Sequence, residues 1–157
     1  MGVHFRPVTS AREEDVRSAL PETDILIKAA AVADYRPANV AEDKMKKKEG
    51  EMSIPLSRTS DILGWVAQNR HPGLFVCGFS METRDMLENS AAKLERKRLD
   101  MIVANNLKVP GAGFGVETNV VTIITRDGVS ELPLMGKDQV AAALLDAIEN
   151  RRSGIAG

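Results

Sequence analysis

Three short apolar runs, separated by segments with helical periodicity, constrain the fold of this chain most strongly. The runs cover residues 24–32, 74–79 and 100–104. Apolar runs of this length, without regular polar alternation, are typical of strands that are buried on both faces of a parallel sheet. The sequence therefore predicts an α/β domain, with a mainly parallel Rossmann-like sheet and flanking helices.

Capping and turn residues predict where the helices begin and end. Ser10 and Glu13 form an S-x-x-E capping box, which predicts a helix over residues 11–20 that Pro21 ends. A second helix is expected after a cap at Thr59 or Ser60. Two longer helices are expected over residues 83–98 and 137–151.

The C-terminal part of the sequence predicts a β-hairpin. Residues 120–125 and 129–134 flank Asp127-Gly128, a strong hairpin turn. Short strands are also expected near residues 3–7 and 52–55. The domain is expected to cover residues 1–152, and residues 153–157 to form a frayed tail.

Composition excludes several classes of function. With 157 residues and a net charge of −1, the chain is expected to form one domain with no overall field that would attract nucleic acid. Aromatic residues make up 4% of the chain, which argues against stacking on single-stranded nucleic acid. No apolar run is long enough to span a membrane, and Cys77, the only cysteine, suits a reducing compartment. We therefore expect a cytoplasmic protein without membrane or nucleic-acid partners.

Polar or small residues follow each of the three predicted parallel strands. The strand ends carry Ala33-Asp34, Gly78-Phe79-Ser80 and Ala104-Asn105. Polar residues resume after any strand, so a single strand end is ambiguous between a turn and a ligand contact. Ligands of open α/β sheets bind beyond the carboxyl ends of the strands, and the agreement of three ends favours a binding site there.

Lysines gather in two places that suit a phosphorylated ligand. Residues 44–48 hold four lysines, which form either an ordinary solvated loop or a flap that closes over phosphates. One ammonium group about 4 Å from a phosphate charge gains roughly 4 kcal/mol at an effective dielectric near 20. Lys93 and Lys97 lie four residues apart and share a helix face, where they either bind phosphate or complement the helix dipole. We expect that face to differ from the packed one, which is formed by Met86, Leu87, Ser90, Ala91 and Leu94.

The sequence does not contain other common nucleotide-binding or catalytic motifs. The glycines of residues 111–115 have G-x-G-x-G spacing and precede a strand, whereas the dinucleotide fingerprint opens a helix. The sequence has no Walker A motif, no metal-spaced histidine cluster and no apparent nucleophilic triad. Cys77 lies in an apolar strand and is interpreted as a packing residue.

Several segments in register resemble the phosphopantothenoylcysteine synthetase family, also called phosphopantothenate–cysteine ligases. AAVADYR (residues 30–36) followed by KMKK (44–47) is the most specific of these matches. TSDIL (59–63) resembles the family's N-P-D-I segment, with Ser60 where proline is usual. The remaining matches are GFSMET (78–83), KLERKRLDMIVAN (93–105) and GFGVETNVVTII (113–124).

The resemblance implies a ligase reaction of coenzyme A biosynthesis. In bacterial members, CTP activates 4′-phosphopantothenate as an acyl-cytidylate, and the amine of cysteine then displaces CMP, with magnesium supporting the nucleotide chemistry. Lys44 is implied as the catalytic flap lysine, and the sequence alone leaves CTP or ATP open as the nucleotide. No residue is implied as a protein metal ligand. The implied nucleotide contacts are Ala30, Asp34, Lys44, Ser60, Asp61, Ile62, Leu63, Phe79, Lys93 and Lys97.

The resemblance also implies that the chain corresponds to the C-terminal portion of the synthetase domain. The family's glycine-rich turn and phosphate-binding segment, which precede this region, have no match here, and neither do the first strands of the fold. We therefore expect low or no activity from this chain alone, and a nucleotide-binding module without activity is the alternative function. The family also implies a homodimer, with a contribution from the hairpin of residues 120–134, and in longer chains fusion to a flavin-dependent decarboxylase domain. An RNA-binding domain that uses the lysine flap is the third and weakest hypothesis.

Overall fold

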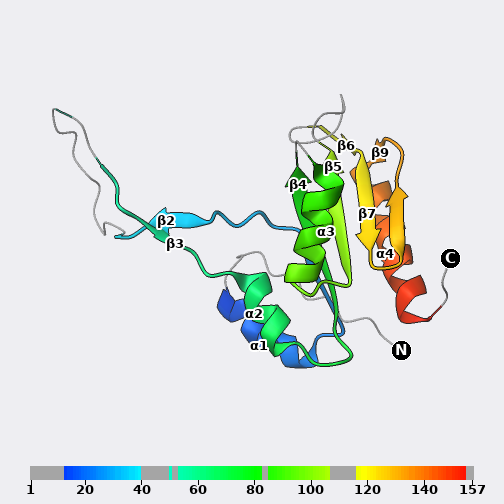
Figure 1. Ribbon diagram of the computed structural model, residues 1–157, viewed down its shortest axis with the longest axis horizontal. Coiled ribbons are helices and arrows are strands. Elements are labelled where there is room, and N and C mark those ends of the chain that lie inside the picture. Colours follow the sequence, from blue (N-terminus) through cyan, green and yellow to red (C-terminus); the bar gives the residue numbers. More distant parts are fainter. Residues whose placement is uncertain (1–12, 40–49, 51–52, 83–84, 107–115, 155–157) are drawn as a thin grey trace.

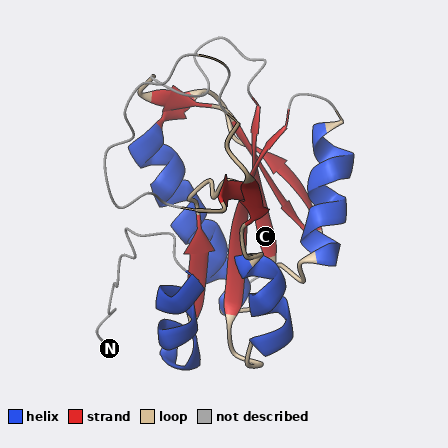
Figure 2. Ribbon diagram, turned by 90° about the vertical axis from the view of Figure 1, so that its left-hand side faces the viewer, coloured by secondary structure: helices blue, strands red, loops and turns tan. Residues whose placement is uncertain are grey.

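A mixed five-stranded sheet forms the centre of the part of the chain that the computed structural model describes, residues 13–39, 50, 53–82, 85–106 and 116–154 (Figures 1 and 2). The strand order is β1-β4-β5-β7-β8. Strands β1 (Ile25–Lys28), β4 (Phe75–Glu82) and β5 (Met101–Asn106) are parallel, whereas β7 (Val121–Thr125) and β8 (Gly128–Glu131) complete the sheet in antiparallel pairing. The predicted α/β class, with a mainly parallel sheet and a late hairpin, is confirmed.

Helices cover both faces of this sheet and divide the core into two layers. The first face is covered by α1 (Glu13–Ala19) with its following 3-10 turn η1 (Leu20–Glu22), by α2 (Ile62–Asn69) and by α3 (Met86–Arg96). The second face is covered by α4 (Lys137–Arg152), whose Val140, Leu144 and Ile148 are buried. Apolar side chains of β4 and β5 alternate between these two layers, which explains their near-continuous apolar sequence.

The predicted helix boundaries are confirmed at one end and need two corrections. The first helix ends at Ala19, before Pro21 as predicted, and Pro21 lies in the separate turn η1, where it lacks only an N–H that would be unpaired there. The cap of α2 is Asp61 rather than Thr59 or Ser60. Helix α3 starts at Met86 rather than after residue 83. Ser10 and Thr83, the other predicted caps, lie outside the described residues.

The predicted strand over residues 24–32 is wrong in its second half. Strand β1 pairs with β4 only as far as Lys28, opposite Gly78. Within 29–33, Val32 is partly buried and the four alanines are exposed. Strand β1 is at the edge of the sheet, and alanine side chains offer little apolar area to hold an edge strand in place.

After this alanine run, the chain forms an arm that extends away from the sheet (Figure 1). The arm is an antiparallel pair of β2 (Tyr35–Pro37) and β3 (Leu56–Arg58). Residues 34–50 have no helical or strand period in the sequence and were expected to form no strand, but they contain β2. The strand expected near residues 52–55 starts later, at Leu56. Both strands are largely exposed, so their pairing rests on backbone hydrogen bonds that leave no apolar period in the sequence.

The predicted hairpin is confirmed, but its two-residue turn is Arg126-Asp127 rather than Asp127-Gly128, because Gly128 already pairs with Thr125 as the first residue of β8. Strand β7 is buried along its whole length because α3 and α4 cover its two faces, whereas β8 is exposed along its whole length. A small antiparallel pair, β6 (Thr118–Asn119) and β9 (Met135–Gly136), leads into α4. The strand predicted near residues 3–7, the glycine run of residues 111–115 and most of the predicted frayed tail lie outside the described residues.

Candidate functional site

Four charged side chains gather at the carboxyl end of β1, beside the middle of β4. We call Lys28, Asp61, Lys93 and Lys97 the edge cluster. Lys97 Nζ forms an ion pair with the Asp61 carboxylate. Lys93 Nζ donates a hydrogen bond to the backbone oxygen of Phe79 at 3.1 Å, and Lys28 Nζ donates one to the backbone oxygen of Ala30 at 2.9 Å. The end of β1, the middle of β4 and two helices thus bring together three ammonium groups and one carboxylate. The strand ends predicted at residues 78–80 and 104–105 are wrong, because β4 continues to Glu82 and β5 to Asn106.

Asp61 holds the start of α2 as well as Lys97. Its Oδ1 accepts a hydrogen bond from the backbone N–H of Gly64 at 2.9 Å, as expected of a helix cap. A Cβ at position 64 would lie 2.6 Å from Asp61 Oδ2, so a glycine at this position makes room for the carboxylate. Burial alone would raise the pKa of Asp61, but the hydrogen bonds from Lys97 and Gly64 and the charges of Lys97 and Arg96 outweigh it and lower the pKa. Asp61 is therefore ionised at neutral pH.

The charge of Lys28 is disfavoured by its surroundings in the edge cluster. Partial burial lowers the pKa of its ammonium group, and the positive charge of Lys93 lowers it further. The negative charge of Asp61 acts in the opposite direction. A cation that is partly desolvated beside another cation is stabilised by any anion that arrives.

The two lysines of α3 lie beside its packed face and not on a separate one. Ser90 and Leu94 are buried, whereas Leu87, which was predicted to pack, is 49% exposed. Lys93 and Lys97 are both partly buried, with their stems along the first layer and their ammonium groups at the sheet edge. The predicted shared face of these two lysines is confirmed, but its separation from the packed face is wrong.

Three predicted contacts occupy the start of α2 in different ways. Ile62 and Leu63 are 5% and 7% exposed, because their side chains pack in the first core layer. Only their backbone groups remain for a ligand at the helix N-terminus. The Ser60 hydroxyl hydrogen-bonds the Glu13 carboxylate, which lowers the pKa of Glu13 and connects this loop to α1.

The start of the arm separates Asp34 from the end of β1. Asp34 was predicted at the carboxyl end of this strand, but β1 ends six positions earlier, at Lys28. The backbone oxygen of Asp34 accepts a hydrogen bond from Thr59 N at 2.9 Å, and that of Ala33 accepts one from Thr59 Oγ1 at 2.5 Å. Asp34 is thus exposed at the base of the arm, opposite Thr59, which precedes Asp61 by two residues. Lys44, like the whole predicted lysine flap, lies outside the described residues.

Comparison with known proteins identifies the family. Residues 1–151 match the sequence model of the DNA/pantothenate metabolism flavoprotein C-terminal domain. The chain belongs to this family. It is 46% identical over 147 residues to the coenzyme A biosynthesis bifunctional protein CoaBC of Bacillus subtilis, a match that covers 92% of this chain and 36% of that protein. The chain therefore spans about a third of the length of this relative.

Solved structures share the fold. The C-terminal domain of a CoaBC protein superposes with a TM-score of 0.72 at 35% identity, over 90% of this chain and 61% of that one. A Cab2 variant in complex with phosphopantothenate-cysteine superposes with a TM-score of 0.66 at 14% identity, over 88% of this chain and 49% of that one. The resemblance to the synthetase portion of CoaBC that the sequence motifs predicted is confirmed.

Lys28 is the member of the edge cluster that sequence reasoning missed. The signal was a lysine at the end of ILIK, an otherwise apolar strand. Leu26 and Lys28 project to the same face because side chains alternate along a strand, so this lysine follows Leu26 toward the first core layer. In a CoaBC-type domain, a charged residue on that face at the carboxyl edge is a candidate ligand contact.

We searched the described residues for a metal site and for a membrane-spanning helix. Among these residues, no group of three or more histidine, cysteine or acidic side chains is arranged to hold a metal ion. No helix among them is both long and apolar enough to cross a membrane. Cys77 is buried, which raises the pKa of its thiol to about 12, and its interpretation as a packing residue is confirmed.

Proposed function

We propose that this chain forms the nucleotide site of a phosphopantothenate–cysteine ligase of coenzyme A biosynthesis. The edge cluster carries this proposal, because three ammonium groups converge where open α/β sheets bind ligands. The family gives the biological context, since the Bacillus subtilis relative is named for coenzyme A biosynthesis. The motif resemblance supplies the substrates, 4′-phosphopantothenate, cysteine and CTP.

The proposed reaction has two steps. The carboxylate of 4′-phosphopantothenate attacks the α-phosphorus of CTP, forms an acyl-cytidylate and releases pyrophosphate. The amine of cysteine then attacks the acyl carbon, which releases CMP and a proton and leaves an amide. Neither step needs a covalent bond to the protein, so the side chains act by positioning and by stabilising charge.

In this proposal, Lys93 and Lys97 bind the phosphates of CTP. Before the nucleotide arrives, Lys97 is held by Asp61 in an ion pair whose carboxylate is 58% exposed. At about 4 Å and an effective dielectric near 20, one phosphate charge attracts an ammonium group by roughly 4 kcal/mol, as one carboxylate charge does, but a triphosphate brings several such charges. A triphosphate can therefore take over Lys97 while Asp61 keeps its bond to Gly64.

The remaining predicted contacts complete the proposed site. Lys44 is proposed as the flap lysine that neutralises charge at the reacting phosphate. The other contacts are proposed to face the nucleotide through backbone or side-chain polar groups: Ala30, Asp34, Ser60, Ile62, Leu63 and Phe79.

Magnesium is proposed as part of the substrate. The described residues do not form an oxygen cage of their own for this ion. Mg²⁺ retains several waters and is commonly held by substrate phosphates with few protein carboxylates. We therefore propose that it arrives bound to the triphosphate of CTP, and we assign no protein ligand to it.

We further propose a cytoplasmic homodimer, and in longer chains a fusion to a flavin-dependent decarboxylase domain. The two-part name of the Bacillus subtilis protein, of which this chain spans 36%, supports the fusion. The exposed strand β8 supports the dimer, because its outer edge has no neighbouring strand among the described residues.

Calorimetric titration with magnesium and either CTP or ATP tests the nucleotide site. We expect saturable binding of CTP, weaker binding of ATP, and about tenfold weaker CTP binding by Lys97→Gln, since one charge-assisted contact to phosphate is lost. Lys137→Gln, at an exposed position on α4, is the matched control and should bind CTP like the unmodified chain. Equal CTP affinity of the Lys97 and Lys137 variants would show that the edge cluster does not bind CTP.

Product analysis separates the ligase from the binding module. The chain is incubated with CTP, magnesium, 4′-phosphopantothenate and cysteine, and phosphopantothenoylcysteine is measured by mass spectrometry. Product supports the ligase in this chain alone. CTP binding without product supports the nucleotide-binding module, and absence of CTP binding would overturn both.

A further inference from the structure

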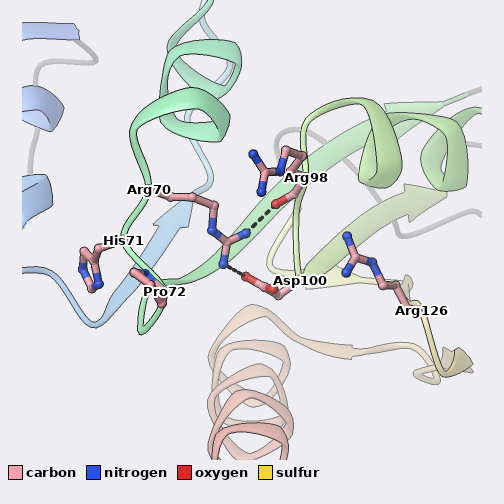
Figure 3. A pocket seen from close by; sticks show the side chains of 6 residues that line it. All are labelled: Arg70, His71, Pro72, Arg98, Asp100 and Arg126. Carbon is pink, nitrogen blue, oxygen red and sulfur yellow. Dashed lines mark hydrogen bonds and ion pairs between the residues drawn. The ribbon is translucent and has the colours of Figure 1, made fainter.

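A second site lies at the opposite edge of the sheet from the edge cluster. A cavity of about 380 Å³ opens at the amino ends of β4 and β5, next to the turn between β7 and β8. Three arginines, one histidine, one proline and one carboxylate line it (Figure 3): Arg70, His71, Pro72, Arg98, Asp100 and Arg126. We call this cavity the arginine pocket.

Arg70 and Asp100 form the fixed wall of the arginine pocket. Arg70 donates to Asp100 Oδ2 at 2.7 Å and to the backbone oxygen of Arg98 at 2.6 Å, and it also bonds the backbone oxygen of Leu74. Asp100 Oδ2 further accepts the N–H of Val76 at 2.7 Å. These bonds explain Arg70 and Asp100 as structural residues that join the end of α2 to the starts of β4 and β5.

The same bonds leave the pocket with an excess of positive charge. Asp100 is the one carboxylate in the lining and is committed to Arg70. Within the described part of the chain, no carboxylate lies within ion-pair distance of Arg98. Its side chain donates one hydrogen bond there, from Nη1 to the backbone oxygen of Ala67 at 3.1 Å. A guanidinium group has five N–H donors, so most of those of Arg98 remain for other partners.

Arg126 adds a second available guanidinium group. Its Nε lies 3.4 Å from Glu95 Oε1, and the two side chains are 60% and 67% exposed. An exposed pair at this distance holds its partners weakly. Figure 3 shows Arg126 and Arg70 on opposite sides of Asp100, with Arg98 above them, so an anion in the pocket would lie among three guanidinium groups.

The backbone at Arg98 adds an independent observation. Arg98 follows the end of α3 with a positive φ of 49°, a conformation for which glycine is the usual residue at a helix C-terminus. The arginine in its place directs a charged side chain to the pocket. One bond to Ala67 accounts for part of this side chain but not for its remaining donors.

We propose that the arginine pocket binds a small tetrahedral oxyanion of the phosphate type, either free phosphate or the phosphoryl group of a small ester. Planar guanidinium groups suit the paired oxygens of phosphate, and several of them around one cavity favour an anion with more than one charge. The volume is near the lower end of the range for ligand pockets, about 300–1,000 Å³, which favours a small ligand. This proposal is independent of the nucleotide site, because it uses other residues at the other edge of the sheet.

Amide NMR titration of the whole chain tests this proposal. Sodium phosphate or glycerol phosphate is added at constant ionic strength, with sodium chloride as the reference. We expect saturable shifts at residues 70–71, 98–100 and 126–127. Whichever of the two probes binds with the higher affinity shows whether the pocket prefers free phosphate or a phosphate ester.

Variants of Arg126 decide whether the pocket itself is responsible. Arg126→Gln should weaken phosphate binding about tenfold, and Arg126→Lys less, because lysine keeps the charge without the planar fork. Arg152→Gln is the matched control, since Arg152 is also exposed and forms an ion pair, to Asp24 at 3.8 Å, outside the pocket. Unchanged amide spectra in the absence of phosphate confirm the fold of each variant.

Three results would overturn the proposal. The first is the absence of saturable shifts at residues 70–71, 98–100 and 126–127. The second is a set of shifts confined to residues 28–30 and 61–64, which would assign phosphate to the edge cluster. The third is equal phosphate affinity for Arg126→Gln and Arg152→Gln.

Discussion

The surroundings of the Lys28 ammonium group influence its charge in two opposite directions. Its burial and the charge of Lys93 disfavour the ammonium form and lower its pKa, whereas Asp61 and the backbone oxygen of Ala30 favour that form. A cation kept in such surroundings costs stability in the ligand-free chain. In the proposed function, this cost is offset when phosphates bind, which is the pattern expected of a ligand-binding side chain.

Lys28→Met is expected to stabilise the chain and to weaken CTP binding. Methionine keeps the length of the stem and removes the charge, so the free energy of unfolding at pH 7 should rise by up to about 1 kcal/mol. Urea unfolding measures this change, and calorimetry measures the affinity for CTP. Lys137→Met, at an exposed position, is the control and should change neither.

The same variant predicts a pH dependence of defined sign. Because the folded pKa of Lys28 lies below its ordinary value of 10.5, the unfolded chain holds more protons than the folded chain between these two pKa values. The stability of the unmodified chain therefore gains from Lys28 as pH rises through that interval, and its deficit relative to Lys28→Met should shrink. A variant that is less stable at all pH values and binds CTP normally would make Lys28 a purely structural residue.

At the scale of single residues, the sequence predicted side chains whose neighbours are close in the chain. Lys93 and Lys97 were paired by helical spacing, and their shared face is confirmed. The pairing of Lys97 with Asp61 joins residues 36 positions apart and has no sequence signal. The arginine pocket was missed for the same reason, since tertiary folding alone brings Arg70, Arg98 and Arg126 together.

At the scale of elements, Gly78 determines how closely α2 and the end of α3 pack on β4. A Cβ at this position would lie 2.9 Å from Leu99 Cδ1 and 3.6 Å from Leu63 Cδ1. Leu99 is fully buried, so its side chain has no open space into which it can move. Gly78 is also the residue that pairs with Lys28, which links core packing to the position of the edge cluster.

Gly78→Ala is expected to lower the free energy of unfolding by about 1–3 kcal/mol, the usual cost of an added methyl group in a packed core. Urea unfolding at neutral pH measures it. Gly154→Ala is an unsuitable control because Gly154 has a positive φ. Ala143→Gly on α4 serves as the reference instead, since glycine in a helix interior should lower the free energy of unfolding by about 1 kcal/mol. A Gly78→Ala chain as stable as the unmodified one would show that Leu99 repacks freely.

Element types were easier to predict than element ends. The runs that became β4 and β5 were correctly assigned as parallel strands, because their apolar residues have core on both faces. The end of β1 was misplaced, because the alanine run looks apolar in sequence but has no partner strand beyond Lys28. The pair β2–β3 was not predicted, because it depends on backbone pairing between segments about twenty residues apart.

At the scale of the whole molecule, the sheet has two edges among the described residues, β1 and β8. On β1, Ile25 and Ile27 are each 37% exposed. On β8, all four residues are exposed, and Val129 is 58% exposed. Exposed strand edges offer unpaired backbone groups and are common sites of association between chains.

The proposed homodimer makes a prediction for the hairpin. If β8 contributes to the interface, Val129→Lys should place a charge in it and shift the chain from dimer to monomer in light scattering. Leu145→Lys on α4 is the control, because Leu145 is 54% exposed and the substitution introduces the same charge on a different surface. Strand pairing to β7 does not depend on the Val129 side chain, and Leu145 is exposed, so both variants should keep the far-ultraviolet circular dichroism of the unmodified chain. Loss of a dimer would lower the unfolding midpoint.

The three masses measured in this experiment separate the alternatives. A dimer that persists in Leu145→Lys and dissociates in Val129→Lys places the hairpin at the interface. A dimer that dissociates only in Leu145→Lys moves the interface to α4. An unmodified chain that is monomeric at all concentrations rejects the homodimer, and the exposed edge of β8 is then protected only by its short length of four residues and by the charge of Glu131.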